Sequence, residues 1–172
     1  AFELFTATDA ARAIQLAVAK GLECWMILHR DYLIEQTSMT FSQHGISHSF
    51  IAAGRPFNPM ERVFVCSIDT LRHRLKKLRQ PNFIVVDECH HAVSKTWSSV
   101  LDWAGRAKIL GLTATPQRLD GKGLSSQFDE LVNGPSTAHL MDEGWLSNYR
   151  AFAPSRPQLD GVHTLAGDYN VG

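Results

Sequence analysis

An apolar run leads directly into charged residues near the middle of this 172-residue chain, in the order Phe83-Ile84-Val85-Val86-Asp87-Glu88-Cys89-His90-His91. A continuous apolar run without polar alternation predicts a strand that is buried on both faces of a parallel sheet. Adjacent carboxylates at the end of such a strand cost free energy unless a cation or a reaction uses them. We therefore take Asp87 and Glu88 as the first candidate functional residues.

Similar short apolar runs recur on both sides of this one and alternate with segments of helical character. The predicted strands are Cys24–Leu28, Ser49–Ala53, Val63–Cys66, Phe83–Val86 and Lys108–Leu112. The predicted helices are Ala10–Ala19 with a cap at Thr8 or Asp9, Asp31–Gln43, Thr70–Arg79 and Trp97–Trp103. Strands that alternate with helices predict an α/β fold with a mainly parallel sheet covered on both faces. From Pro154 onward periodicity is lost, so we expect a domain over 1–153 and a linker over 154–172.

The composition narrows the class of protein. Seventeen basic residues balance seventeen acidic ones, so any contact with nucleic acid must come from a local patch. No apolar run approaches the roughly 20 residues that a membrane span needs, and the first residues do not form a signal peptide. The three cysteines, Cys24, Cys66 and Cys89, are scattered without metal-site spacing. These features predict reduced thiols in a cytoplasmic protein.

Polar residues also follow other predicted strands, where open α/β sheets bind ligands. Thr113 and Thr115 follow the strand 108–112, and Ser67 and Thr70 follow the strand 63–66 and open a helix. Each pair has a simpler explanation, a capped turn for the threonines and helix capping by Ser67. Carboxylates in the order Asp87, Glu88 suit a nucleotide-hydrolysing site, where one holds the shell of Mg²⁺ and the next polarises a water.

Together, in order and spacing, these segments resemble the first RecA-like domain of superfamily 2 helicases of the DEAD/DEAH type. Residues 87–90 are similar to motif II in a DECH form, and Thr113-Ala114-Thr115 to motif III. The segment around Ser67 and Thr70 resembles motif Ib, and Leu28–Gln36 resembles motif Ia. Residues 116–124 are similar to the bacterial and phage-type branch, and residues 144–170 to the lead into a second motor domain. The resemblance covers nearly the whole chain.

The resemblance implies a RecA-like three-layer sandwich of the P-loop NTPase type, with ATP and Mg²⁺ as cofactors of the parent protein. It implies that Asp87 binds Mg²⁺, that Glu88 orients or deprotonates the attacking water, and that His90 links this site to motif III or to a second RecA-like domain. It further implies contacts to DNA or RNA, or a coupling role, for Arg30, Gln36, Ser67, Thr70, Thr113 and Thr115. Arg72 and Arg74, on the basic helix, are candidates for phosphate contact or for an ordinary solvated face.

A motor of this family also needs a glycine-rich loop that ends in Gly-Lys-Thr or Gly-Lys-Ser, and this chain contains none. The place for the loop falls at residues 1–9, where Phe5-Thr6-Ala7-Thr8-Asp9 has neither glycine nor lysine. Either the chain is a piece of a larger helicase, or the loop has degenerated and Phe2–Phe5 stands in for its strand. We expect weak ATP binding or none, and no helicase activity from this chain alone.

Two readings from other classes remain open. A non-catalytic module that binds nucleic acid or protein would keep the fold without turnover. A metal-dependent phosphoesterase would use Asp87, Glu88 and the two histidines, and would need tight binding of a divalent metal without nucleotide. A metal site made by His90 and His91 is disfavoured because adjacent side chains diverge and no further ligand has suitable spacing.

Overall fold

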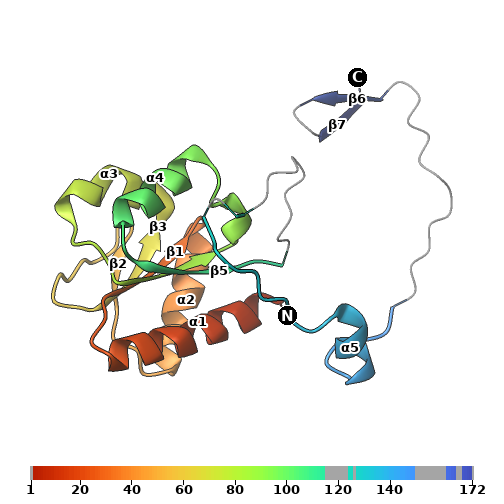
Figure 1. Cartoon of the computed structure of the whole chain (residues 1–172), viewed down its shortest axis with the longest axis horizontal. Helices are drawn as coiled ribbons and strands as arrows, with labels where there is room; N and C mark the ends of the chain where they lie inside the picture. Colours follow the sequence, from red (N-terminus) through yellow and green to blue (C-terminus); the bar gives the residue numbers. More distant parts are fainter. Residues whose placement is uncertain (1, 115–123, 126, 150–161, 166–167, 172) are drawn as a thin grey trace. The chain divides into compact units, whose positions relative to one another are not determined.

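Five parallel strands form the sheet that the apolar runs predict. In the computed structural model the described residues are 2–114, 124–125, 127–149, 162–165 and 168–171, with side chains described from residue 8 to 149 within these ranges. The strands are β1 (Cys24–Leu28), β2 (Ser49–Ile51), β3 (Val63–Ser67), β4 (Phe83–Asp87) and β5 (Lys108–Leu112). Their order in the sheet is β2-β3-β1-β4-β5, and every neighbouring pair is parallel (Figure 1).

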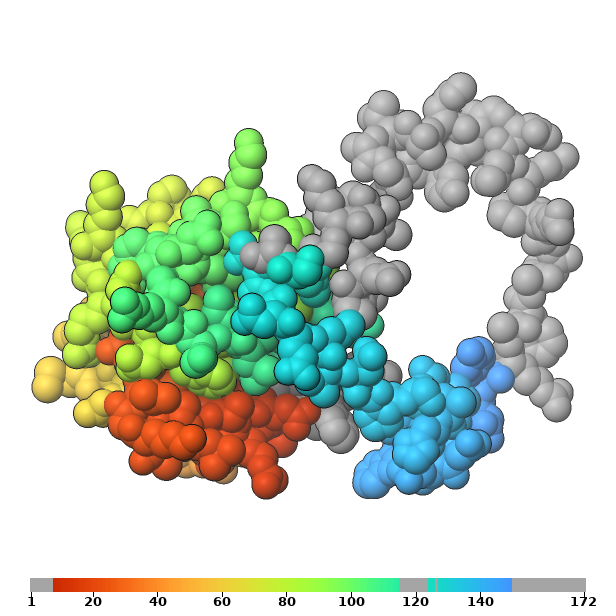
Figure 2. All heavy atoms as spheres, in the orientation of Figure 1, coloured from red at the N-terminus to blue at the C-terminus, as the bar shows by residue number. Residues whose placement is uncertain are grey.

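Helices cover both faces of this sheet. Helices α1 (Phe2–Ala19) and α2 (Asp31–Gln43) lie on one face, and α3 (Ile68–Arg74) and α4 (Lys95–Ala104) on the other (Figure 1). In the space-filling view, the red atoms of α1 lie on one side of the part of the chain that contains the sheet. The yellow-green to green atoms of α3 and α4 lie on the opposite side (Figure 2). The predicted three-layer α/β arrangement of the RecA-like type is confirmed.

Strand β1 shows why the sheet needs two layers of helices. Its side chains alternate, so that Cys24, Met26 and Leu28 pack toward α1 and α2, whereas Trp25 and Ile27 pack toward α3 and α4. All five side chains are buried. A strand with apolar residues at every position is stable only when both faces are covered, and this explains its unbroken apolar sequence.

The register of the strands aligns their carboxyl ends. Leu28 of β1 pairs with Ser67 of β3, and Asp87 of β4 pairs with Leu112 of β5. Because Ile27 pairs with Val86, the same register places Asp87 beside Leu28. Residues that follow the strands therefore emerge at one edge, which we call the carboxyl edge.

Several helix and strand boundaries differ from the sequence prediction. Helix α1 begins at Phe2, so neither Thr8 nor Asp9 caps it, and Phe2–Phe5 does not form a strand. Strand β2 ends at Ile51. The basic helix ends at Arg74 and continues as a short 3-10 turn, η1 (Leu75–Lys77), after which Leu78 is extended. This unwinding lets Arg79 reach the Glu23 carboxylate, at 3.1 Å.

The chain divides into two compact units, Ala1–Leu131 and Val132–Gly172. The second contains α5 (Thr137–Asp142), whose N-cap Ser136 accepts a hydrogen bond from the His139 amide, and an antiparallel pair, β6 (Val162–Leu165) and β7 (Asp168–Val171). The sequence predicted no strands there. That residues 154–172 lead to a further domain stays a prediction. Within the described part of the chain, no helix is both long and apolar enough to cross a membrane.

Candidate functional site

A left-handed turn begins where β4 ends. Glu88 has φ of 50° and ψ of 50°, and no other non-glycine residue in the described ranges has a positive φ. Its amide donates a hydrogen bond to Asp87 Oδ1 at 3.0 Å, and the 3-10 turn η2 (Cys89–His91) follows. A left-handed glutamate costs about 1–3 kcal/mol and persists only when its surroundings impose it. The turn places two successive carboxylates at the carboxyl edge.

His90 lies between the second carboxylate and β5. Its Nδ1 is 3.1 Å from Glu88 Oε2 and 3.1 Å from Thr113 Oγ1. Because a carboxylate only accepts hydrogen bonds, His90 Nδ1 must carry a proton to donate a hydrogen bond to Glu88. The sequence-predicted residues Glu88, His90 and Thr113 therefore form one contact group, which we call the Glu88 group. The other predicted threonine, Thr115, lies outside the described residues.

A tight contact beneath this group fixes β5 against the turn. A Cβ atom on Gly111 would lie 2.8 Å from Cys89 Sγ and 2.6 Å from the Phe128 ring, so only glycine fits without a shift. Cys89 is buried, and burial together with the nearby charges of Glu88 and Asp87 raises the pKa of its thiol to about 11. A thiol with such a pKa is protonated at neutral pH, so Cys89 acts in packing rather than as a nucleophile.

Sequence reasoning missed His29, which follows β1 as Asp87 ends β4. The His29 ring centroid is 5.3 Å from that of His91, and the His91 centroid is 4.2 Å from that of His90. His29 Nε2 also accepts a hydrogen bond from Arg30 Nε at 3.0 Å. Since β1 and β4 are neighbours, the position of His29 directly after a buried strand was the signal that could have found it.

The other residues predicted to contact nucleic acid lie in the segments that follow β1 and β3. Ser67 ends β3 at the N-cap position of α3 but makes no capping hydrogen bond with its side chain, and Thr70 lies in the first turn of α3. Arg30, Arg72 and Arg74 are exposed, and Gln36 is half-buried on α2. Arg72 pairs with Asp69 at 3.5 Å. The structure brings none of these into the Glu88 group.

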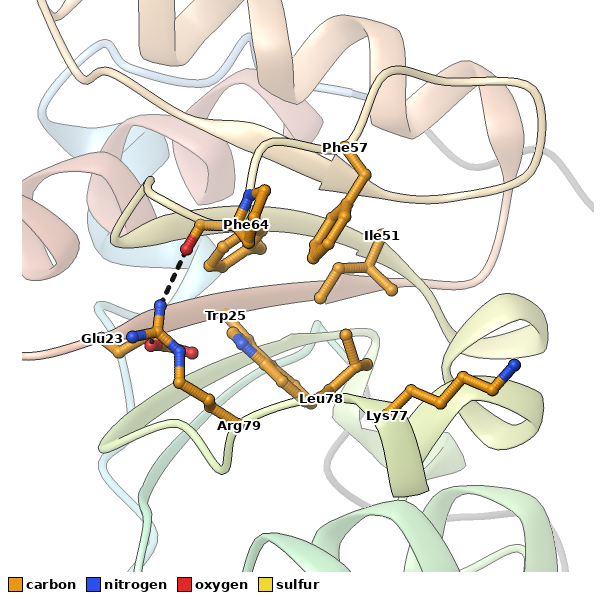
Figure 3. Close-up of a pocket in the computed structure, with 9 residues that line it drawn as sticks. Glu23, Trp25, Ile51, Phe57, Phe64, Lys77, Leu78 and Arg79 are labelled. Carbon is orange, nitrogen blue, oxygen red and sulfur yellow. Dashed lines mark hydrogen bonds and ion pairs between the residues drawn. The ribbon is translucent and has the colours of Figure 1, made fainter.

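A cavity of about 250 Å³ opens beside the turn, between the elements that follow β1, β3 and β4. It is lined by His29, Ile68, Asp69, His91, Ser94, Thr96 and Trp97. A smaller cavity of about 100 Å³ lies at the opposite edge, where Trp25, Phe57 and Phe64 line it and Arg79 lies beside Glu23 (Figure 3). No predicted site residue lines either of these two cavities, but His29 and Ile68 of the larger one directly neighbour Arg30 and Ser67 in the sequence.

The donor set at the turn fits Mg²⁺ that arrives with a nucleotide. Mg²⁺ in such sites is held by one or two carboxylates, with waters and substrate phosphates as the remaining ligands. Asp87, half-buried at the end of β4, supplies one carboxylate of this kind. Within the described ranges, no three side chains of the His, Cys, Asp and Glu types converge as a metal site of their own.

Residues 5–9, the predicted place of a phosphate loop, offer the phosphates of a nucleotide no comparable fit. The segment predicted to occupy the place of a phosphate loop, residues 5–9, belongs to α1. In a continuous helix the backbone amides donate to carbonyl groups of the same helix. In a phosphate loop several backbone amides point at the ligand instead. The chain therefore presents carboxylates at the carboxyl edge without a phosphate cradle at residues 5–9.

Comparisons with known proteins agree with this geometry. The family model described as "Type III restriction enzyme, res subunit" matches residues 5–118. A 51.5 kDa protein of a Lactococcus phage is 27% identical over 156 residues, which cover 91% of this chain and 32% of that protein.

Two yeast relatives are more similar over shorter lengths. The putative ATP-dependent helicase IRC3 of Saccharomyces cerevisiae is 35% identical over 118 residues, covering 63% of this chain and 17% of that protein. The putative mitochondrial ATP-dependent helicase irc3 of Schizosaccharomyces pombe is 34% identical over 136 residues, covering 72% and 22%. The chain thus spans at most 32% of the length of these three relatives.

Proposed function

This chain belongs to the family of the type III restriction enzyme res subunit and has the motor-domain fold of superfamily 2 helicases, and from that premise we propose that it is the first motor-domain portion of an ATP-dependent helicase or translocase acting on DNA or RNA. In this proposal it supplies the metal and water side of the hydrolysis site. The remaining ligands of ATP, and the second RecA-like domain, come from outside the 172 residues.

The observation that carries the proposal is the Glu88 group. A left-handed residue places the Glu88 carboxylate next to His90, and His90 in turn contacts Thr113 at the end of the neighbouring strand. A structural ion pair would need neither the strained backbone nor the link to β5. A carboxylate that must be aimed at a water needs both, because general-base catalysis depends on positions within hydrogen-bond reach.

Each residue of the turn has a defined part in this proposal. Asp87 would hold Mg²⁺, and the ion would neutralise charge on the phosphates of a bound nucleotide. Glu88 accepts a proton from the attacking water or orients it, and His90 keeps the Glu88 carboxylate in place through Nδ1. Thr113 connects this arrangement to β5 and hence to the segment that follows.

By itself this chain turns over no ATP in our proposal. The phosphate cradle does not fit residues 5–9, and phosphoryl transfer in this class also draws arginines from a second domain. Binding to nucleic acid comes from a local set of exposed cations, Arg30, Arg72 and Arg74, because the chain is neutral as a whole. Such binding is weak and falls steeply with salt.

The test joins this chain to a Gly-Lys-Thr loop and a second motor domain in one polypeptide. We expect ATP hydrolysis that nucleic acid stimulates, and a loss of about 10²–10⁴-fold in kcat when Glu88 becomes Gln, as for removal of a general base. The control is Glu143→Gln, a change of the same type in the second unit, which should leave the rate unchanged. Hydrolysis that survives Glu88→Gln at full rate would overturn the proposal.

A second candidate is a non-catalytic module that binds nucleic acid or protein. The observation that favours it is the helix at residues 5–9 where a phosphate loop would stand. The same joined polypeptide separates the two, since a binding module yields no ATPase even when both missing parts are supplied.

A further inference from the structure

Three imidazole rings form a row across the carboxyl edge, from β1 past β4 toward β5. The row begins at His29, continues through His91 at 5.3 Å between ring centroids, and reaches His90 at 4.2 Å. His90 Nδ1 then lies 3.1 Å from Thr113 Oγ1 and from Glu88 Oε2. We call these three residues the histidine row. It is a continuous chain of contacts between the end of β1 and the Glu88 group.

The outer end of the row is held by an arginine. Arg30 Nε donates to His29 Nε2 at 3.0 Å. A guanidinium group has donors and no acceptor, so His29 Nε2 must carry a lone pair in this contact. A protonated imidazole would place N–H against N–H. His29 is therefore neutral here, with its proton on Nδ1.

The Nδ1 proton of His29 lies in an unfavourable environment. His29 Nδ1 is buried and has no hydrogen-bond partner among the described residues. A buried donor without an acceptor costs free energy, because it has given up its hydrogen bond to water. The contact with Arg30 thus fixes His29 in a tautomer that its surroundings do not favour, and any ligand that draws Arg30 away relieves this cost.

Arg30 remains able to bind a ligand while it holds His29. Its side chain is exposed, and the bond to His29 uses one of the five N–H donors of the guanidinium. A phosphate can engage the other four first and then pull the group from His29. Arg30 therefore contacts both the solvent and the first residue of the histidine row.

We propose that His29 is a positioning residue that couples Arg30 to His90 and the Glu88 group through its ring contact with His91. When a phosphate withdraws Arg30, His29 loses its Nδ1 proton to water and gains one on Nε2. Its Nδ1 then presents a lone pair instead of an N–H in the buried environment next to the His91 ring. The inference rests on the proposed function, in which Arg30 contacts nucleic acid and Glu88 serves hydrolysis.

The test uses the 172-residue chain with ¹⁵N-labelled histidine and long-range ¹H–¹⁵N spectra, recorded above the pH range in which histidines titrate. These spectra report which ring nitrogen carries the proton. We expect the Nδ1–H tautomer for His29. In Arg30→Met, which keeps the length of the side chain and removes its donors, we expect His29 to change to Nε2–H and the His91 and His90 signals to shift.

Two further variants give the comparison its controls. Arg106→Met removes an exposed arginine that precedes β5 at the opposite edge, and it should leave all three signals unchanged. His29→Phe keeps a ring and removes the acceptor, so adding Arg30→Met to it should no longer shift His90. If His29→Phe does not fold, the Arg30→Met and Arg106→Met spectra still decide the question.

Either of two results would overturn the inference: an Nε2–H tautomer for His29 in the unmodified chain, or a His90 signal that Arg30→Met leaves unmoved. Simple packing of the three rings predicts the second result. Neither ATP nor nucleic acid is present in these experiments, so a failed inference leaves the proposed function standing. Conversely, a joined polypeptide without ATPase would leave the tautomer result intact.

Discussion

Two glutamates at opposite ends of the same sheet are held in different ways. Glu23 precedes β1, its side chain is 14% exposed, and its carboxylate lies 3.1 Å from Arg79 Nη2. Glu88 follows β4, its side chain is 39% exposed, and its partner is an imidazole at the same distance. Burial raises the pKa of Glu23, against the opposing charge of Arg79. Glu23 is enclosed and matched by a cation, whereas Glu88 is more open and strained.

The difference bears on the proposal that Glu88, unlike Glu23, is placed for chemistry. Arg79 also donates to the Pro59 carbonyl at 2.9 Å, so Glu23 and Arg79 tie the loop after β2 to the edge of the small cavity in Figure 3. Glu88 instead pairs with His90, two residues further along the chain. Its left-handed backbone weakens the fold locally and directs its carboxylate toward His90. Strain of this sort concentrates at functional sites.

The largest expected effect is a loss of stability at the carboxyl edge, near Glu88, in Gly111→Ala. The new Cβ would meet the Phe128 ring at 2.6 Å and Cys89 Sγ at 2.8 Å, which pushes β5 from the turn. We expect a loss of about 1–3 kcal/mol in the free energy of unfolding, as for overpacked cores, measured by urea denaturation. Gly134→Ala is the control, because its Cβ meets nothing within 4 Å. Equal stability of the two variants would show that the carboxyl edge is loosely packed.

Replacing each glutamate by glycine should change the free energy of unfolding in opposite directions. Glu88→Gly relieves the left-handed strain but makes the unfolded chain more flexible, for a net gain of about 0–1 kcal/mol. Glu23→Gly relieves no strain, since Glu23 does not have a positive φ, and it removes the carboxylate with which Arg79 forms an ion pair. We expect it to lower the free energy of unfolding by about 1 kcal/mol. Chemical denaturation of both variants checks this, and a larger loss at Glu88 than at Glu23 would refute the comparison.

The smallest expected effect is a change in the pH dependence of stability in Glu23→Gln. The pKa of Glu23 in the fold is raised above its ordinary value of 4.5, chiefly because burial disfavours the charged form. The folded state therefore holds this proton more tightly than the unfolded state, and stability falls as pH rises from 4.5 through the raised pKa. In Glu23→Gln this fall should shrink by less than about 1 kcal/mol. Thermal melts across this range measure it, and an unchanged pH dependence would exclude Glu23 as the cause.

The sequence predicted the sheet well because buried parallel strands leave a strong signal. Unbroken apolar runs such as Cys24–Leu28 located the strands, and Asp31–Gln43 matched α2 at both ends. The basic helix was predicted too long, since leucine spacing does not show that Arg79 turns to Glu23. The beginning of α1 was also wrong, because Thr8 and Asp9 are good caps in isolation but lie within a helix.

The sequence named the members of the Glu88 group but not their geometry. The order of Asp87, Glu88 and His90 led to the prediction of nucleotide hydrolysis, which stays a prediction, and alignment of strand ends brought Thr113 beside His90. Nothing in the sequence indicates the left-handed Glu88. The close approach of Gly111 to Phe128 and Cys89 is also hidden in the sequence, because it depends on side chains from distant segments. His29 was missed since its role appears only when β1 is known to lie beside β4.

The central claim is that this chain carries the metal and water side of a hydrolysis site without the phosphate side. A titration of the 172-residue chain with fluorescent ATP in the presence of Mg²⁺ tests it most directly. We predict no saturable binding in the micromolar range, and no difference between the unmodified chain and Glu88→Gln. Saturable binding with a micromolar Kd would contradict the account, because it would require a phosphate-binding element within these residues.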